Sequence, residues 1–131
     1  MPAHSALITI MDKAARKAAP RLRRDFNEVS QLQVSRKGPS DFVSNADRAA
    51  EKTIVEVLRQ ARPDWGLVLE EGGEIEGDPA RPRWIVDPLD GTSNFLHGIP
   101  IFSISVALEH DGHIVSGLVY QRLTHESFCA E

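Results

Sequence analysis

Two aspartates and a threonine stand close together in the segment Trp84–Phe95, which reads WIVDPLDGTSNF. The apolar run before Asp87 predicts a buried strand, and the acids and the hydroxyl follow where that strand ends. Pro88 fixes its own φ and favours an extended residue before it, so the chain leaves the strand along a stiff path. We therefore interpret the segment as a site that presents Asp87, Asp90 and Thr92 at a strand end.

The charges of Asp87 and Asp90 are close enough in the sequence to interact. Two carboxylates about 4 Å apart repel by about 4 kcal/mol at an effective dielectric constant of about 20. At neutral pH such a pair needs a cation, a shared proton or good solvation. A backbone carbonyl and a hydroxyl lie nearby, with no His or Cys between them. These oxygen donors favour a hard divalent ion, Mg²⁺ before Ca²⁺.

The residues after Asp90 add an anion-binding feature. Gly91 lets another group approach the backbone closely, and Thr92 or Ser93 can begin a helix whose free N–H groups bind an anion. A metal ion beside a phosphate-binding backbone indicates phosphoryl chemistry. The alternative is a strand followed by an Asx-type turn with a helix cap. It accounts for Asp90 and Gly91, but not for the second carboxylate and the threonine together.

The run DPLDGTSNF resembles the motif of the inositol monophosphatase-like phosphatases: apolar–Asp–Pro–apolar–Asp–Gly–Thr, a small residue, then Asn-Phe. Two further family elements match, namely D-x-V-(S/T)-x-x-D at Asp41–Asp47 and the acidic pair Glu70–Glu71. The residue before that pair is Leu69, where the family often has Gly. The resemblance covers essentially the whole chain. It implies a lithium-sensitive, Mg²⁺-dependent phosphatase that hydrolyses a phosphate monoester, inositol monophosphate first, with Mn²⁺ as the other usable ion.

The resemblance also implies a set of metal ligands. One ion would be held by Glu70, Asp87 and the backbone carbonyl of Leu89, and a second would be shared by Asp87 and Asp90. A bound divalent ion lowers the pKa of a coordinated water and neutralises charge on the leaving oxygen.

Catalytic and phosphate-binding roles follow from the same resemblance. Glu70 and Thr92 would orient the attacking water, and Asp47 would lie near the metal-bound waters. The backbone N–H groups of Gly91, Thr92 and Ser93 would hold the phosphate, supplying the positioning that dominates phosphoryl transfer.

Composition sets the class of protein. The 131 residues are 41% hydrophobic and 26% charged, which suits one globular domain. The net charge of −4 argues against a general nucleic-acid or anionic-membrane binder. Cys129 is the only cysteine, so an internal disulfide cannot form. The apolar stretch Ala6–Met11 is too short for a signal sequence, and no segment approaches transmembrane length. We expect a cytoplasmic protein.

Two amphipathic helices are predicted in the first half of the chain, because apolar residues recur every three or four positions from Ser5 to about Leu32 and from Ala46 to Ala61. Pro20 should kink or split the first helix, and Pro63 should stop the second. An extended segment is expected at Asp41–Val43.

Asp47 has a structural interpretation beside its implied catalytic one. Ser44 and Asp47 form an S-x-x-D pattern, which is typical of a capping box ahead of a helix. The two roles are compatible, and both stay open at this point.

Strands are predicted in the second half. A short apolar strand should deliver Glu70 at its end, and the Gly-, Pro- and charge-rich stretch Gly72–Arg83 should be an exposed loop able to act as a lid. Alternation and turn signals then predict a half-buried strand, a primed two-residue hairpin turn and two further strands. These are Ile101–Leu108, Asp111–Gly112, Ile114–Tyr120 and His125–Ala130.

The predicted fold class is α+β, with two helices packed on one face of a largely antiparallel sheet. This is similar to the N-terminal half of the family's layered αβαβα sugar-phosphatase fold. The resemblance implies that residues 1–131 are a single domain, the metal- and phosphate-binding half, and that the family's C-terminal domain is absent from this sequence. An incomplete site and an open strand edge then imply a homo-oligomer or association with another chain.

Two other functions stay open. One is a sister phosphatase acting on a sugar bisphosphate, a nucleotide bisphosphate or histidinol phosphate, since selectivity would lie in the absent half. In either case the partner is a small phosphorylated alcohol. The other is a metal- and phosphate-binding fragment or interaction module without turnover.

Overall fold

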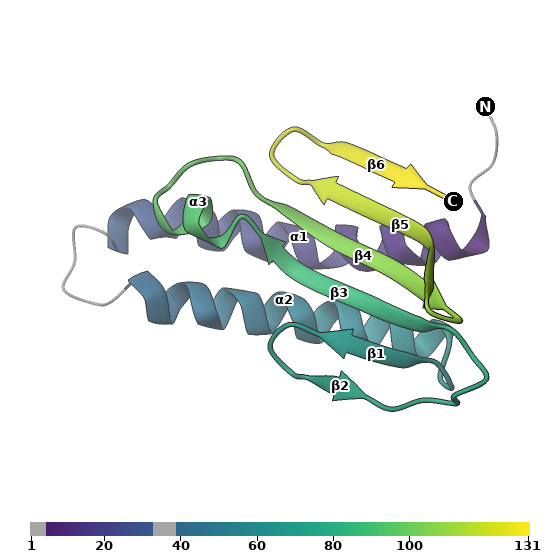
Figure 1. The fold of residues 1–131 in the computed structure, drawn as a ribbon. Helices are drawn as coiled ribbons and strands as arrows, with labels where there is room; N and C mark the ends of the chain where they lie inside the picture. Colours follow the sequence, from purple (N-terminus) through teal and green to yellow (C-terminus); the bar gives the residue numbers. More distant parts are fainter. Residues whose placement is uncertain (1–4, 33–38) are drawn as a thin grey trace.

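Two long helices and a six-stranded sheet make up the chain in the computed structural model, which describes residues 5–32 and 39–131 (Figure 1). The helices α1 and α2 come first, and a short helix α3 interrupts the strands. The elements are α1 (Ala6–Leu32), α2 (Pro39–Ala61), β1 (Gly66–Leu69), β2 (Glu74–Ile75), β3 (Arg83–Asp90), α3 (Thr92–Leu96), β4 (Ser103–His110), β5 (His113–Gln121) and β6 (Glu126–Ala130).

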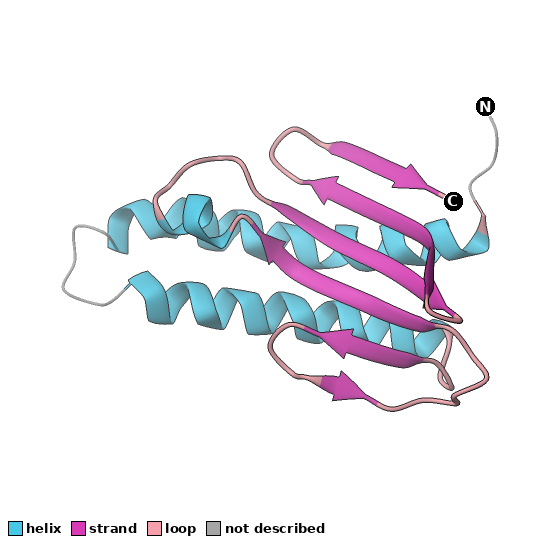
Figure 2. Ribbon diagram, viewed as in Figure 1, coloured by secondary structure: helices cyan, strands magenta, loops and turns pink. Residues whose placement is uncertain are grey.

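The sheet has the order β2-β1-β3-β4-β5-β6. Every neighbouring pair is antiparallel except β1 and β3, which run parallel. Figure 2 shows both long helices on the same face of this sheet. The predicted α+β class, with two helices on a largely antiparallel sheet, is confirmed.

The core lies between the helices and the sheet face that they cover. On β4 the predicted alternation is observed, because Ile104, Val106 and Leu108 are buried while Ser105 and Ala107 are only partly so. Helix α1 presents its apolar stripe to the same core. No described helix is long and apolar enough to cross a membrane.

Helix α1 runs through Pro20 as a single element, so the chain is not split there. A proline inside a helix costs about 3 kcal/mol, mainly through a lost hydrogen bond and a steric clash. Pro20 lies on the exposed side, whereas the neighbouring Ala18, Ala19 and Leu22 are buried. We attribute the continuity to this tertiary packing, which holds both flanks in helical register.

Helix α2 begins at Pro39, so the expected extended segment Asp41–Val43 is helical and that expectation is wrong. Proline suits the first position of a helix, where its missing N–H has no intrahelical partner to lose. Val43 is buried with the rest of the helix's apolar stripe, which favours the earlier start. The helix ends at Ala61, two residues before Pro63, as predicted.

The predicted loop Gly72–Arg83 contains one element that sequence reasoning did not anticipate. Strand β2 lies within it and pairs antiparallel with β1, with Leu67 opposite Ile75. The predicted hairpin turn is confirmed, because Asp111 and Gly112 both have positive φ (51° and 79°), as a type I′ turn requires.

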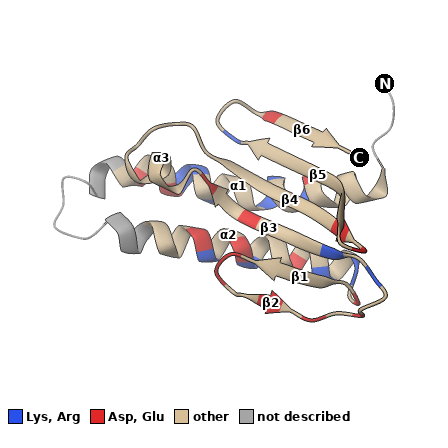
Figure 3. Ribbon diagram, in the orientation of Figure 1, with Lys and Arg blue, Asp and Glu red and all other residues tan. Residues whose placement is uncertain are grey.

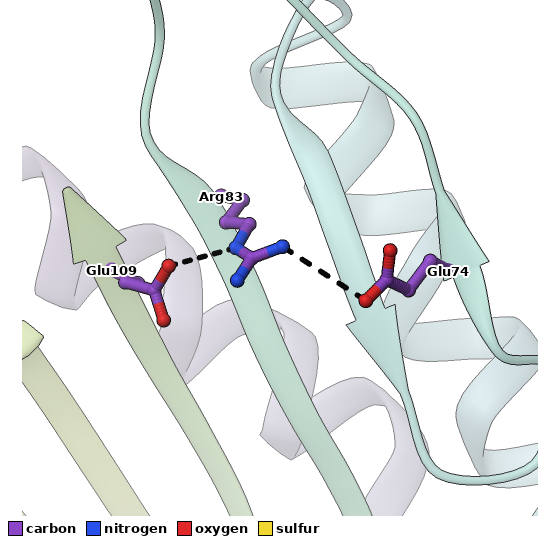
Figure 4. A network of polar contacts seen from close by, with 3 residues as sticks. All are labelled: Glu74, Arg83 and Glu109. Atoms are coloured by element: carbon purple, nitrogen blue, oxygen red, sulfur yellow. Dashed lines mark hydrogen bonds and ion pairs between the residues drawn. The ribbon is translucent and has the colours of Figure 1, made fainter. Parts of the chain in front are cut away.

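Arg83, at the start of β3, links three strands (Figure 4). Its Nε donates to Glu109 Oε1 on β4 at 2.8 Å, and its Nη1 lies 4.0 Å from Glu74 Oε1 on β2. These contacts, with the hydrogen bond to Glu109 foremost, raise the pKa of the Arg83 guanidinium. Both acids at this end of the sheet therefore face a positive charge.

Candidate active site

Three elements bring acidic side chains together at the other end of β3. The parallel pairing places Leu69 opposite Val86, so Glu70 and Asp87 follow at the same edge of the sheet. Helix α2, which packs against β3, contributes Asp47. Figure 3 shows acidic segments of α2, of β3 and of the β1–β2 connection next to one another. The structure thus gathers three of the predicted site residues.

Glu70 and Asp87 share a hydrogen bond between their side chains. This bond, then burial and the neighbouring charges of Asp87, Asp47 and Glu71, raises the pKa of Glu70 from 4.5 to about 7. Asp87 Oδ1 also accepts a hydrogen bond of 3.2 Å from the Leu89 N–H across the proline. Without a cation, the raised pKa favours a protonated Glu70 beside Asp87.

Asp47 is buried, with only 4% of the residue exposed. Its Oδ1 has no hydrogen-bond partner in the described part of the chain. Burial, followed by the charges of Glu71, Asp87 and Glu51, raises its pKa from 3.8 to about 7. Because α2 begins at Pro39, Asp47 lies inside the helix, and its interpretation as a cap at the helix start is wrong.

The donor chemistry of these acids fits a divalent cation. A buried carboxylate oxygen without a partner is costly unless a cation or a proton reaches it, and carboxylates are ligands that Mg²⁺ prefers. Over residues 5–32 and 39–131, no three Asp, Glu, His or Cys side chains are arranged so that they could hold an ion between them. The acids are neighbours, but they do not converge on one point.

Asp90 is separated from this group by an irregularity in strand pairing. The register between β3 and β4 shifts between Asp87 and Asp90, and Asp90 lies opposite Ser103. Asp90 is exposed and lines a surface hollow together with Gly91 and Asn94. It is not among the charges that raise the pKa values of the other site acids.

Gly91 and Thr92 form the start of α3, as predicted. Gly91 is the N-cap residue with φ 91°, and a Cβ there would lie 2.9 Å from the Ile101 carbonyl oxygen, so only glycine fits.

Thr92 Oγ1 donates to the Leu89 carbonyl oxygen at 3.0 Å. No side chain caps the helix. The threonine hydroxyl therefore holds the carbonyl that the family resemblance assigns to a metal ion. The N–H groups of Thr92 and Ser93 precede the first bond of this short helix, from Phe95 N–H to the Gly91 carbonyl.

Glu51 is a residue of the site that sequence reasoning missed. It is buried on α2, one turn after Asp47, and accepts hydrogen bonds from the backbone N–H groups of Glu71 and Gly72. The available signal was an acid four residues from Asp47, on the same helix face as Ala50 and Ile54. A charged residue in an apolar stripe needs a polar partner, which this one finds in a distant turn.

Residues 4–131 match the family model described as the inositol monophosphatase family. The chain belongs to the inositol monophosphatase family. It is 57% identical over 129 residues to the inositol-1-monophosphatase of Rhizobium meliloti, covering 98% of this chain and 48% of the relative. It is 39% identical to the Nus factor SuhB of Pasteurella multocida, over 95% of this chain and 46% of that protein.

The fold is shared with solved structures of the family. The crystal structure of the extragenic suppressor protein SuhB from Bartonella henselae superimposes with a TM-score of 0.84 at 54% identity. That match covers 97% of this chain and 49% of the other. The chain therefore spans about half the length of the relatives it matches.

Proposed function

We propose that this chain supplies the metal- and phosphate-binding half of a Mg²⁺-dependent phosphatase that hydrolyses inositol monophosphate. One observation carries the proposal: Asp47, Glu70 and Asp87 come together from three parts of the chain, and the pKa values of Asp47 and Glu70 are raised by burial and by other acids, with no base among the described residues that shift them. The names of relatives such as the Rhizobium meliloti protein support the substrate.

In this proposal Glu70, Asp87, the Leu89 carbonyl and Asp90 would hold the metal. Bound Mg²⁺, or Mn²⁺ in its place, would supply Lewis acidity that activates water and neutralises phosphate charge. Asp90 would have to approach the other acids for this, since it lies past the pairing irregularity. The buried side chain of Leu89 anchors the carbonyl beside it.

The chain's own groups then act on the water and the phosphate. Glu70 would orient the attacking water, as the family resemblance implies, from its position beside Asp87. Thr92 orients that water while its hydroxyl is held at Leu89 O. The N–H groups of Gly91, Thr92 and Ser93 bind phosphate oxygens at the start of α3. Asp47, whose buried Oδ1 has no partner among the described residues, would lie near the metal-bound waters.

A second candidate is an association function without turnover. Several relatives carry the name Nus factor SuhB rather than that of an enzyme. The sheet face opposite α1 and α2 exposes Val119 and Phe128, the latter 58% exposed, and β6 is exposed along its length. Such a face and edge suit pairing with a second copy or with another chain.

A chimera separates these candidates. Residues 1–131 would replace the matching half of the Rhizobium meliloti relative, and phosphate release from inositol monophosphate would be measured with Mg²⁺, beside the intact relative as a positive control. We expect turnover by the chimera, inhibition by Li⁺, and a rate orders of magnitude lower for the 131-residue chain alone. A folded chimera that releases no phosphate would contradict the catalytic proposal and favour the association function. Sugar bisphosphates, nucleotide bisphosphates and histidinol phosphate complete the substrate panel.

A further inference from the structure

Glu51 makes two hydrogen bonds that connect α2 to a turn twenty residues away. Its Oε2 accepts the Glu71 N–H at 3.0 Å, and its Oε1 accepts the Gly72 N–H at 2.9 Å. The residue is only 5% exposed. A carboxylate is the side chain that can accept two adjacent backbone N–H groups at once, because both of its oxygens are acceptors.

The turn that Glu51 holds is the one that carries Glu70. A short hydrogen bond from the Leu69 N–H to the Gly73 carbonyl, 2.6 Å long, closes this turn. Gly72 also packs closely against Leu69 and Glu51. A Cβ on Gly72 would lie 3.1 Å from Leu69 Cδ1 and 3.2 Å from Glu51 Oε1. The backbone on the C-terminal side of Glu70 is therefore fixed against α2.

The same helix carries Asp47 one turn earlier. A rigid helix holds Asp47 and Glu51 at a constant separation of one turn. Fixing the turn to Glu51 therefore fixes Glu70 relative to Asp47. The negative charge of Glu51 repels the other acids. Its two backbone hydrogen bonds oppose this repulsion and keep the turn that carries Glu70 next to α2.

We propose that Glu51 is a positioning residue: it ties the turn bearing Glu70 to α2 and thereby sets the affinity of the site for a divalent ion. This rests on the proposed function, because it concerns the same metal site. Groups that orient metal ligands through hydrogen bonds typically change metal affinity by about 10- to 100-fold when they are replaced.

The test compares Glu51→Gln with Glu56→Gln, a control that replaces an exposed glutamate on the same helix. Glutamine keeps the size of the side chain, but its carbonyl oxygen can accept a hydrogen bond from only one of the two N–H groups. Its NH₂ group is a donor and would face the other N–H without forming a hydrogen bond. Mn²⁺ binding to the 131-residue chain would be followed by isothermal titration calorimetry well below the melting temperature. We expect Glu51→Gln to weaken Mn²⁺ binding by at least about tenfold, and Glu56→Gln to match wild type.

Amide hydrogen exchange gives a second readout that does not depend on the metal. We expect the Glu71 and Gly72 amides to be protected in wild type and in Glu56→Gln, and to lose protection in Glu51→Gln while the α2 amides keep theirs. If Glu51→Gln does not fold, Glu51→Asp replaces it, since it keeps both acceptors on a shorter stem and should bind Mn²⁺ with intermediate affinity.

The outcomes distinguish the two proposals. A wild-type chain that binds no Mn²⁺ overturns the proposed function. A wild-type chain that binds Mn²⁺, with unchanged affinity in a Glu51→Gln variant that merely melts earlier, overturns the positioning role of Glu51 and leaves the proposed function standing.

Discussion

Acidic side chains gather at both ends of β3, but within residues 5–32 and 39–131 only the group at the start of the strand contacts a base. At the start of the strand, the Arg83 guanidinium lies between Glu109 and Glu74, and the contacts are solvent-exposed. At the far end, Glu70 hydrogen-bonds Asp87 and the pKa values of Glu70 and Asp47 are raised only by burial and by other acids.

The difference shows where the fold tolerates an electrostatic cost. Exposed ion pairs contribute little to stability, so the Arg83 group serves mainly to align strands. At the far end Asp47 is buried and Asp87 is half-buried, and acids in such surroundings that face one another destabilise a fold at neutral pH. A cost of this kind is typical of functional sites. A divalent ion would remove it, which is why we place the metal at this end of the strand.

The largest expected effect comes from removing a proposed ligand. Asp87→Asn in the chimera should lower phosphate release by at least about 10²- to 10³-fold, because it removes a proposed ligand of the metal ion that would stabilise charge on the reacting phosphate. Glu109→Gln, the matched change at the other end of β3, should leave the rate unchanged. Comparable losses in both variants would mean that activity follows general stability. They would contradict the proposal that only the Asp87 end of β3 holds the metal.

Asp47 should make stability depend on pH in the absence of divalent ions. Its pKa is 3.8 in the unfolded chain and about 7 in the folded one, so its favourable contribution is complete below pH 3.8 and is lost as the pH rises through about 7. The loss amounts to at most about 4 kcal/mol of unfolding free energy. Asp47→Asn should therefore be more stable than wild type at pH 8 and equal to it near pH 3.8.

Urea denaturation at both pH values, in EDTA, measures this difference. A wild-type chain that is as stable as Asp47→Asn at pH 8 would show that the carboxylate of Asp47 is solvated or paired when ionised.

Thr92 offers a smaller effect with two separable parts. Its hydroxyl bond to the Leu89 carbonyl is worth about 1 kcal/mol, so Thr92→Ala should melt slightly earlier, whereas Thr92→Ser should be close to wild type. If the hydroxyl also orients the attacking water, Thr92→Ala in the chimera should lose about tenfold or more of kcat/KM. Full turnover in a Thr92→Ala chimera that only melts earlier would restrict the residue to a structural role.

The smallest effect is expected at Arg83. Arg83→Gln removes an exposed guanidinium, so it should lower the melting temperature only slightly and leave Mn²⁺ affinity unchanged. Thermal denaturation followed by circular dichroism, with and without Mn²⁺, checks both points. A large loss of metal binding in this variant would show that the two ends of β3 are coupled.

Local patterns in the sequence were enough to predict much of this fold. The alternation of Ile104, Val106 and Leu108 and the Asp111–Gly112 turn are short-range signals, and the structure confirms both. The strand that carries Trp84–Val86 was also predicted, but β3 runs on through Pro88 to Asp90, so Asp87 lies within the strand and not after its end. In each case the residues that determine the conformation are neighbours in the chain.

Features set by distant contacts were not predictable in the same way. The S-x-x-D pattern indicated a helix start, but packing of Val43 favours a start at Pro39, which places Asp47 inside α2. Strand β2 forms because β1 offers it an edge. The role of Glu51 depends on a turn twenty residues away, which no periodicity reveals.

We expect the acids at the end of β3 to bind a divalent ion in exchange for protons. Calorimetric titration of the 131-residue chain with Mn²⁺ at pH 7, repeated in two buffers of different ionisation enthalpy, measures both binding and proton release. Because Asp47 and Glu70 each have a pKa of about 7, we predict binding with release of about one proton per ion, and loss of both in Asp87→Asn. Equal Mn²⁺ affinity in wild type and Asp87→Asn, or binding without proton release, would show that these acids do not hold the ion.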